Sequence, residues 1–174
     1  MVENGIPADS SAIIYLAKAA GLAAAYARFG PLLVPPAVWA EVVTAGVRDG
    51  RAEVAAVEKA VADGHVRRAA FDAALRRRAH KLELQFGLGA GESEVLALGL
   101  AAELVLIDEH RATRAAMALG VSSLETAFVP ALCAQAGVLD ARAAHELLDA
   151  IGRHTKVRAE LAIRARQLIE EATT

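Results

Sequence analysis

Short apolar segments alternate along the chain with longer stretches in which apolar residues recur at helical spacing. Each apolar segment leads directly to a polar or turn residue, and this alternation predicts an α/β fold with a parallel sheet. Strands are expected at 6–8, 32–34, 104–107 and 120–121, with an edge strand at 65–69. Helices are expected at 11–18, 37–44, 51–62, 91–102, 111–119, 127–136, 141–151 and 156–172. Because no repeat or linker interrupts this pattern, we expect a single domain over 1–174.

Capping residues support several of these helix boundaries. Asp9 or Ser10 can cap the first helix, and Asp140 can cap the helix at 141–151. Pro36 suits a first helical turn, where a proline costs no intrahelical hydrogen bond. Gly46 is expected to end the helix that starts there.

Composition restricts the class of protein further. The chain has 174 residues, a formal net charge of −2 and one cysteine. A disulfide scaffold is therefore excluded, and Cys133, which lies among apolar residues, is expected to be a buried thiol. The near-neutral charge argues against a surface that coats nucleic acid by bulk electrostatics, although a local basic patch remains compatible with it.

No segment has the pattern of a membrane span or a secretion signal. The apolar stretch 12–27 lacks a positive region before it and contains Lys18. No uncharged run approaches the roughly 18 residues that span a bilayer. We expect a cytoplasmic protein that does not enter a membrane.

Acidic residues stand at positions where an α/β sheet gathers its functional groups. Asp9 and Asp108 each follow an expected strand, Glu41 lies on the helix after the second strand, and Glu92 begins the helix before the Asp108 strand. In open parallel sheets, ligands bind beyond the carboxyl ends of the strands. Carboxylates placed together repel, and a cation such as Mg²⁺, which prefers oxygen ligands, relieves that repulsion. Spacing alone leaves a structural alternative open, because Asp9 can also serve as a helix cap and nothing more.

Four blocks of sequence closely resemble the PIN-domain family, and within it the VapC-like branch. They occur in the family's order and cover about two thirds of the chain. The blocks are Asp9-Ser10-Ser11-Ala12-Ile13-Ile14-Tyr15-Leu16-Ala17-Lys18, Leu33-Val34-Pro35-Pro36-Ala37-Val38-Trp39-Ala40-Glu41-Val42, Leu88-Gly89-Ala90-Gly91-Glu92-Ser93-Glu94 and Leu104-Val105-Leu106-Ile107-Asp108-Glu109.

The resemblance implies a three-layer α/β/α fold with a short parallel sheet, here with extra C-terminal helices at 126–174. It also implies a metal-dependent endoribonuclease that cleaves single-stranded or structured RNA with Mg²⁺ or Mn²⁺. Carried over by position, the acidic quartet that forms the catalytic and metal site comprises Asp9, Glu41, Glu92 and Asp108. Glu94 and Glu109 are the nearest competitors for these places, and Ser10 is a candidate hydrogen-bond donor beside the first aspartate.

VapC-like proteins are commonly homodimers held inactive by an antitoxin, so the resemblance also implies a second copy and an antitoxin protein as partners. Positive charge near the acids is expected from Arg111 and Arg114, which open the helix after Asp108 and are candidate phosphate contacts. Trp39 is expected to pack its helix onto the sheet rather than to stack on a base.

Departures from the family pattern, among them a short strand before Asp9 that begins with Pro7 only two residues upstream, leave an alternative function open. The interval from Glu92 to Asp108 is shorter than expected, and Ser122-Ser123-Leu124-Glu125 replaces the usual Gly-Thr pair after Gly120. A PIN fold without catalysis, kept for binding or as a scaffold, is therefore the alternative. A receiver domain fits less well, because it would want a paired acidic motif and a lysine after a later strand. A haloacid-type phosphatase fits less well, because the first strand is followed by Asp-Ser-Ser and not by an Asp-x-Asp motif.

Overall fold

The computed structural model describes residues 5–155 and 157–172. Within these residues the sheet consists of five short strands, all parallel: β1 (Ile6–Pro7), β2 (Leu32–Val34), β3 (Val66–Arg68), β4 (Val105–Leu106) and β5 (Ser123–Leu124). β1, β2 and β3 form one ladder, and β4 and β5 form another. A bridge between Ala8 and Leu106 joins the two ladders, so the spatial order is β3-β2-β1-β4-β5.

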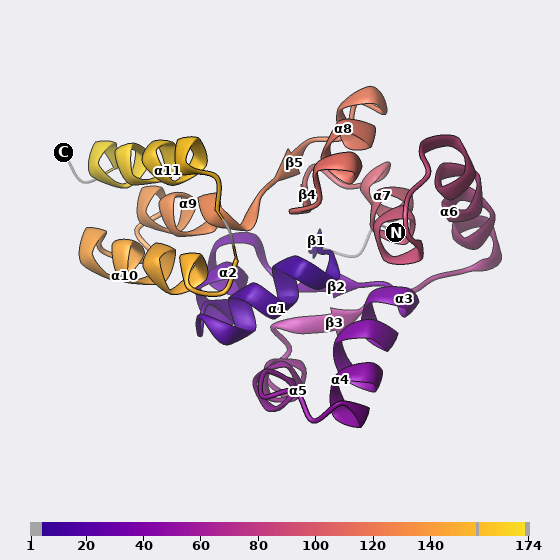
Figure 1. The fold of residues 1–174 in the computed structure, drawn as a ribbon, viewed down its shortest axis with the longest axis horizontal. Helices are drawn as coiled ribbons and strands as arrows, with labels where there is room; N and C mark the ends of the chain where they lie inside the picture. Colours follow the sequence, from indigo (N-terminus) through magenta and orange to yellow (C-terminus); the bar gives the residue numbers. More distant parts are fainter. Residues whose placement is uncertain (1–4, 156, 173–174) are drawn as a thin grey trace.

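The centre of this sheet is the place where the strand order reverses. From β1 the chain continues to β2 and β3 on one side, and it later returns to β4 and β5 on the other side. Figure 1 shows these strands in the middle of the molecule with helices around them. The residues that follow β1 and β4 therefore meet at a topological switch point, where open α/β sheets bind their ligands.

The edge strand expected at 65–69 is confirmed as β3, but the prediction of a strand at 120–121 was wrong. Gly120 has a positive φ of 70°, and the N–H of Val121 donates to the carbonyl of Ala116. Both residues therefore belong to the turn that closes the preceding helix. The strand starts later, at Ser123, where pairing with Val105 begins.

Helices make up most of the rest of the described chain. Their bounds are α1 (Ser10–Lys18), α2 (Leu22–Phe29), α3 (Pro36–Trp39), α4 (Ala45–Arg48), α5 (Val54–Ala62), α6 (Ala73–Phe86), α7 (Ala90–Gly99), α8 (His110–Ala118), α9 (Val129–Gln135), α10 (Ala141–Gly152) and α11 (Ala159–Glu171), with a π-helical segment η1 (Ala40–Thr44) and a 3-10 turn η2 (Thr126–Phe128). Asp9 caps α1 and Asp140 caps α10, as expected.

Three helical features differ from the sequence expectation. The helices α2 and α6 were not placed by the apolar pattern. Gly46 does not end its helix, because α3, η1 and α4 run on to Arg48. Gly46 is instead buried, and a Cβ there would stand 2.6 Å from Cγ2 of Val54 on the neighbouring α5. This glycine therefore allows two helices to approach closely, and it is not a stop signal.

The layers agree with the expected α/β/α architecture. α7 packs against β1 and β4, whereas α1 packs against α2, α5 and α10. Figure 1 shows α9, α10 and α11 gathered at one end of the molecule and α6, α7 and α8 at the other. The C-terminal helices thus extend the fold beyond the sheet.

The core has a main part around the sheet and a smaller part in the C-terminal helices. The smaller cluster is built mostly from alanine, and its buried members are Ala127, Ala131, Ala134, Ala144, Leu148, Ala165 and Ile169. Cys133 belongs to the main core, where burial raises the pKa of its thiol to about 11. Trp39 packs against the same core, as expected. In the described part of the chain, no helix combines the length and the apolar character needed to cross a membrane.

Candidate functional site

Asp9 is held at the carboxyl end of β1 by two backbone N–H groups. Its Oδ1 accepts from the N–H of Ala12 at 2.7 Å, which caps α1. Its Oδ2 accepts from the N–H of Asp108 at 3.0 Å, which ties it to the residue that follows β4. The side chain is almost fully buried, with 4% exposure. The cap geometry and the switch point therefore position the same carboxylate.

Asp108 lies beside Asp9, but its carboxylate is bound to the chain that follows β5. Oδ1 accepts from the N–H of Thr126 at 2.8 Å, and Oδ2 accepts from the hydroxyl of the same threonine at 2.5 Å. Thr126 is 1% exposed. One buried residue therefore restrains both oxygens of Asp108.

Glu41 reaches the site from a π-helical segment. It lies in η1, and its Oε2 accepts from the hydroxyl of Ser10 at 2.6 Å. A π-helical turn adds a residue to the helical register, and such turns occur frequently at functional sites. Ser10, the expected donor beside Asp9, is thus bound to a second acid of the quartet.

Glu92 sits in the first turn of α7, and its Oε2 accepts from the N–H of Gly89 at 2.8 Å. The competing Glu94 points elsewhere, because its Oε2 accepts from the N–H of Ala37 at 2.7 Å and so caps α3. The other competitor, Glu109, caps α8 through the N–H of Ala112 and also reaches the site.

Asp9, Glu41, Glu92 and Glu109 line one cavity of about 280 Å³, which we call the acid pocket. Ser10 and the backbone of Gly89–Gly91 complete its wall. The carboxylate of Asp108 is not among the groups that line it, since it opens into a second cavity. The structure therefore brings three members of the quartet into one pocket and leaves the fourth at its border.

Concentrated negative charge raises the pKa of the central acids. The pKa of Asp9 is raised to about 7, chiefly because burial disfavours its charged form, and further by the charges of Asp108 and Glu92. Burial also raises the pKa of Asp108, against the opposing effect of its bonds from Thr126. The pocket is therefore a place where an added cation is electrostatically favoured.

The donor chemistry of the acid pocket suits a hard divalent cation, since carboxylate oxygens are the ligands that Mg²⁺ and Mn²⁺ prefer. The acidic side chains, however, do not converge on one point. Among the described residues, no three histidine, cysteine, aspartate or glutamate side chains stand close enough together to hold one ion. Each acid of the quartet instead accepts a hydrogen bond from within the chain.

The two arginines expected near the acids share a cavity on the far side of Glu109. Arg111 and Arg114 line this cavity with Phe86 and His110. One N–H of Arg111 donates to the carbonyl of Gly87 at 2.7 Å, which fixes its position. Arg114 forms no ion pair with any residue that the structure describes. Because Glu109 borders both cavities, positive charge adjoins the acid pocket directly.

Two residues of this region were not found from the sequence. Thr126 holds Asp108, and Arg158 lines the cavity into which Asp108 opens. Thr126 follows the last strand by two residues. A correct prediction of β5 would therefore have placed Thr126 at the end of a strand. Arg158 belongs to the C-terminal part, where the helical pattern carries no such signal.

A parallel α/β sheet with a buried aspartate, Asp9, and a half-buried one, Asp108, at its switch point defines the class of fold and site. The chain matches a family model described as DUF3368, PIN domain, over residues 6–171, and it therefore belongs to the PIN-domain family. This confirms the resemblance to the PIN-domain family. PIN domains are generally nucleases that use divalent metal ions, so membership indicates a nuclease-type function. Neither a search of curated proteins nor a search of solved structures found a match.

Proposed function

We propose that the protein is a metal-dependent endoribonuclease that cleaves single-stranded RNA, with Asp9, Glu41, Glu92 and Asp108 as its catalytic and metal-binding acids. The observation that carries the proposal is the meeting of Asp9 and Asp108 at the switch point, where a backbone N–H of one binds the carboxylate of the other. Glu41 and Glu92 complete an acidic pocket around Asp9. Family membership supports the nuclease class.

The residues of the chain have separable roles in this proposal. Asp9 is rigid, because two backbone donors fix both of its oxygens. Ser10 orients Glu41, and the N–H of Gly89 orients Glu92. A bound Mg²⁺ or Mn²⁺ would supply water activation and neutralise charge on the phosphodiester. Arg111 and Arg114 lie where flanking phosphates of an RNA strand would enter.

The biological setting that we propose is the toxin component of a VapBC-like toxin–antitoxin pair in the cytoplasm, with the protein as a homodimer that an antitoxin inhibits. This setting rests on the VapC-like sequence blocks and on family membership. The exposed apolar side chains of Leu84 on α6 and Met117 on α8 are compatible with a protein partner.

A catalytically inactive PIN fold that serves binding is the second candidate. It is favoured by the internal hydrogen bonds that already occupy each acid of the quartet, most of all the two that Thr126 makes to Asp108. In that case the acids act as caps and loop anchors, and replacing Asp9 changes stability but no activity.

Cleavage of a mixed single-stranded RNA pool by the purified chain distinguishes the two candidates. The reaction is run with Mg²⁺ or Mn²⁺, with EDTA, and with Asp9→Asn. The matched control is Asp140→Asn, because Asp140 caps α10 through the N–H of Ala143 at 2.7 Å in the same geometry but far along the chain from the acid pocket. We expect metal-dependent cleavage that Asp9→Asn loses and Asp140→Asn keeps. No cleavage with either ion by the folded, antitoxin-free protein contradicts the nuclease proposal and favours the binding function.

A further inference from the structure

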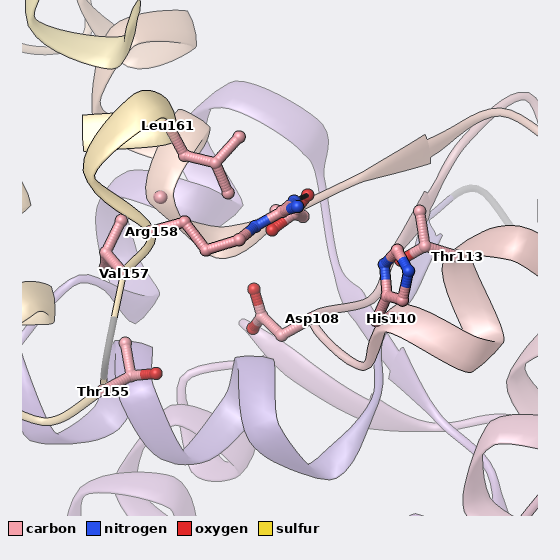
Figure 2. A pocket seen from close by; sticks show the side chains of 9 residues that line it. Asp108, His110, Thr113, Thr155, Val157, Arg158 and Leu161 are labelled. Atoms are coloured by element: carbon pink, nitrogen blue, oxygen red, sulfur yellow. Dashed lines mark hydrogen bonds and ion pairs between the residues drawn. The ribbon is translucent and has the colours of Figure 1, made fainter. Parts of the chain in front are cut away.

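A second cavity, of about 340 Å³, opens on the other side of Asp108. Its walls come from Asp108 and the start of α8, from the segment after β5, and from residues just before and at the start of α11. The cavity therefore joins the sheet edge to the C-terminal part of the chain. Figure 2 shows Arg158 extending across it from one wall, with His110 and Thr113 on the opposite wall and Asp108 between them. The volume lies within the range of small-ligand sites.

The guanidinium of Arg158 is held in this cavity but retains free donors. One of its N–H groups donates to Oε1 of Glu125 at 2.8 Å, and the side chain is 56% exposed. Within the described residues it has no other hydrogen-bond partner. A guanidinium carries five N–H donors in a planar fork, so several remain directed into the cavity or to solvent.

The charges that line the cavity indicate what kind of ligand needs Arg158. Asp108 and Glu125 both line it, and both repel a phosphate. Arg158 is the one arginine or lysine among the described lining residues. Thr113 and Thr155 add polar side chains to the cavity, although the hydroxyl of Thr113 already donates to the carbonyl of Glu109 at 3.1 Å, and Val157 and Leu161 add apolar surface. A ligand that combines an anion, hydroxyl groups and a flat apolar body fits these walls, and a nucleotide is such a ligand.

We propose that this cavity is the subsite for the nucleotide next to the scissile phosphodiester, and that Arg158 binds the phosphate of that nucleotide. The inference rests on the proposed function, since it places the same RNA strand across Asp108. Arg111 and Arg114 line the cavity that shares Glu109 with the acid pocket. His110 lines both that cavity and the cavity of Arg158, so one RNA strand can contact all three arginines. The C-terminal helices thus contribute directly to substrate binding.

The test measures binding of a fluorescent single-stranded RNA to the chain with Asp9→Asn, in Mg²⁺ and at several salt concentrations. We expect Arg158→Gln to raise Kd about tenfold, as loss of one charged hydrogen bond does. The slope of log Kd against log salt becomes shallower by about 0.7, the value for one phosphate contact on a single strand. Arg158→Lys recovers part of the affinity because it keeps the charge.

Two further variants separate ligand binding from a structural role of the ion pair. Glu125→Gln breaks the same pair but removes a negative charge, so it is expected to tighten RNA binding. Arg164→Gln is the control, because Arg164 lies on the same helix α11, is 54% exposed and pairs with Glu171 at 3.4 Å. It should leave both Kd and the salt slope unchanged.

The outcomes distinguish this inference from the nuclease proposal. Equal losses of RNA affinity in Arg158→Gln and Glu125→Gln, or an unchanged Kd in Arg158→Gln, overturn the subsite. If the chain with native Asp9 cleaves RNA, Arg158→Gln should raise KM and leave kcat nearly unchanged. A chain that binds RNA in the expected pattern but does not cut it supports the contact between Arg158 and an RNA phosphate and overturns the nuclease proposal. Absence of RNA binding overturns both.

Discussion

Asp9 combines a structural and a proposed chemical role in one buried carboxylate. It caps α1 and receives the N–H of Asp108, so the fold itself requires an acceptor at this position. These bonds favour the charged form, but burial and the neighbouring acids oppose it more strongly, and the pKa rises to about 7. A helix cap that serves stability alone gains nothing from such crowding with other acids.

The raised pKa of Asp9 predicts how stability depends on pH in metal-free protein. The native state binds the proton more tightly than the unfolded state, whose aspartate has an ordinary pKa near 3.8. The contribution of Asp9 to the free energy of unfolding is therefore fully present below about pH 4. It is lost as the pH rises towards about 7. We expect the free energy of unfolding to fall by a few kcal/mol across this window, measured by urea denaturation in EDTA.

The control for this pH dependence is Asp9→Asn, which cannot ionise. Its stability should change less between pH 4 and pH 8 than that of the wild type, whereas Asp140→Asn should keep the wild-type profile. The amide also presents a donor to one of two N–H groups, so an overall cost of about 1–3 kcal/mol is expected at every pH. Parallel profiles for the wild type and Asp9→Asn contradict the assignment of the shift to Asp9.

Thr126 provides a second prediction at the scale of single residues. Thr126→Val keeps the shape of the side chain but removes the hydroxyl that donates to Asp108. We expect a loss of about 1–3 kcal/mol, because a buried carboxylate oxygen loses its partner. In the cleavage assay Thr126→Val should also change kcat, since Asp108 is no longer restrained. Thr126→Ser restores the hydroxyl, and its failure to recover stability and kcat contradicts a role through the hydrogen bond.

At the scale of elements, the strands that precede the acids were located well from the sequence. β1, β2 and β4 are short apolar segments followed at once by a polar residue or proline, which is a local signal. β5 was misplaced because its two residues are only half-buried and carry little apolar pattern. The apolar pattern did not predict the helix α6, because most of its surface is exposed and charged, including Arg76, Arg77 and Arg78.

The candidate site was likewise predicted where the signal is local in the sequence, and it was not predicted where it depends on contacts between distant segments. The positions of Asp9, Glu41 and Glu92 around one pocket agree with the sequence hypothesis, although their chemical roles stay predictions. The direction of the Asp108 carboxylate could not be predicted, because it depends on Thr126 from a different strand end. The π-helical turn at Glu41 was not predicted either, since the pattern over 37–44 is that of an ordinary helix.

The approach of α7 to β4 depends on Gly99 and predicts a contrast between two glycines. Gly99 ends α7, and a Cβ there would stand 2.5 Å from Cγ1 of Val105. Gly99→Ala should therefore destabilise the protein by about 1–3 kcal/mol through overpacking. It should also shift the strand that leads to Asp108.

Gly152 is the matched control for Gly99. It ends α10, and a Cβ there meets nothing within 4 Å. Gly152→Ala should raise stability by as much as about 1 kcal/mol, because alanine has the higher helix propensity. Thermal unfolding measures the stability of both variants. A Gly99→Ala variant of unchanged stability would show that the short connection between α7 and β4 can move to accommodate the added methyl group.

At the scale of the whole molecule, acidic and basic side chains line neighbouring cavities at the start of α8. The net charge of the chain is only −2, so the molecule as a whole does not attract RNA. Positive charge is instead supplied locally, by Arg111 and Arg114 in the cavity that adjoins the acid pocket and by Arg158 in the cavity that Asp108 lines. Binding under this arrangement depends on a few contacts. A cation at the acids, or the loss of one acidic charge as in Asp9→Asn, reduces their repulsion of phosphate.

That repulsion predicts that divalent ions stabilise the whole fold. Mg²⁺ or Mn²⁺ at the acid pocket binds the native state alone, which at about 100 times Kd adds about 2.7 kcal/mol and raises Tm by roughly 5–10 °C. The increase should be larger at pH 8 than at pH 5.5, because Asp9 must be ionised to bind the ion. Asp140→Asn should keep the increase and Asp9→Asn should lose it. An equal shift in both variants would mean that the ions bind elsewhere, and the acids would then be structural anchors of a PIN fold that binds without cutting.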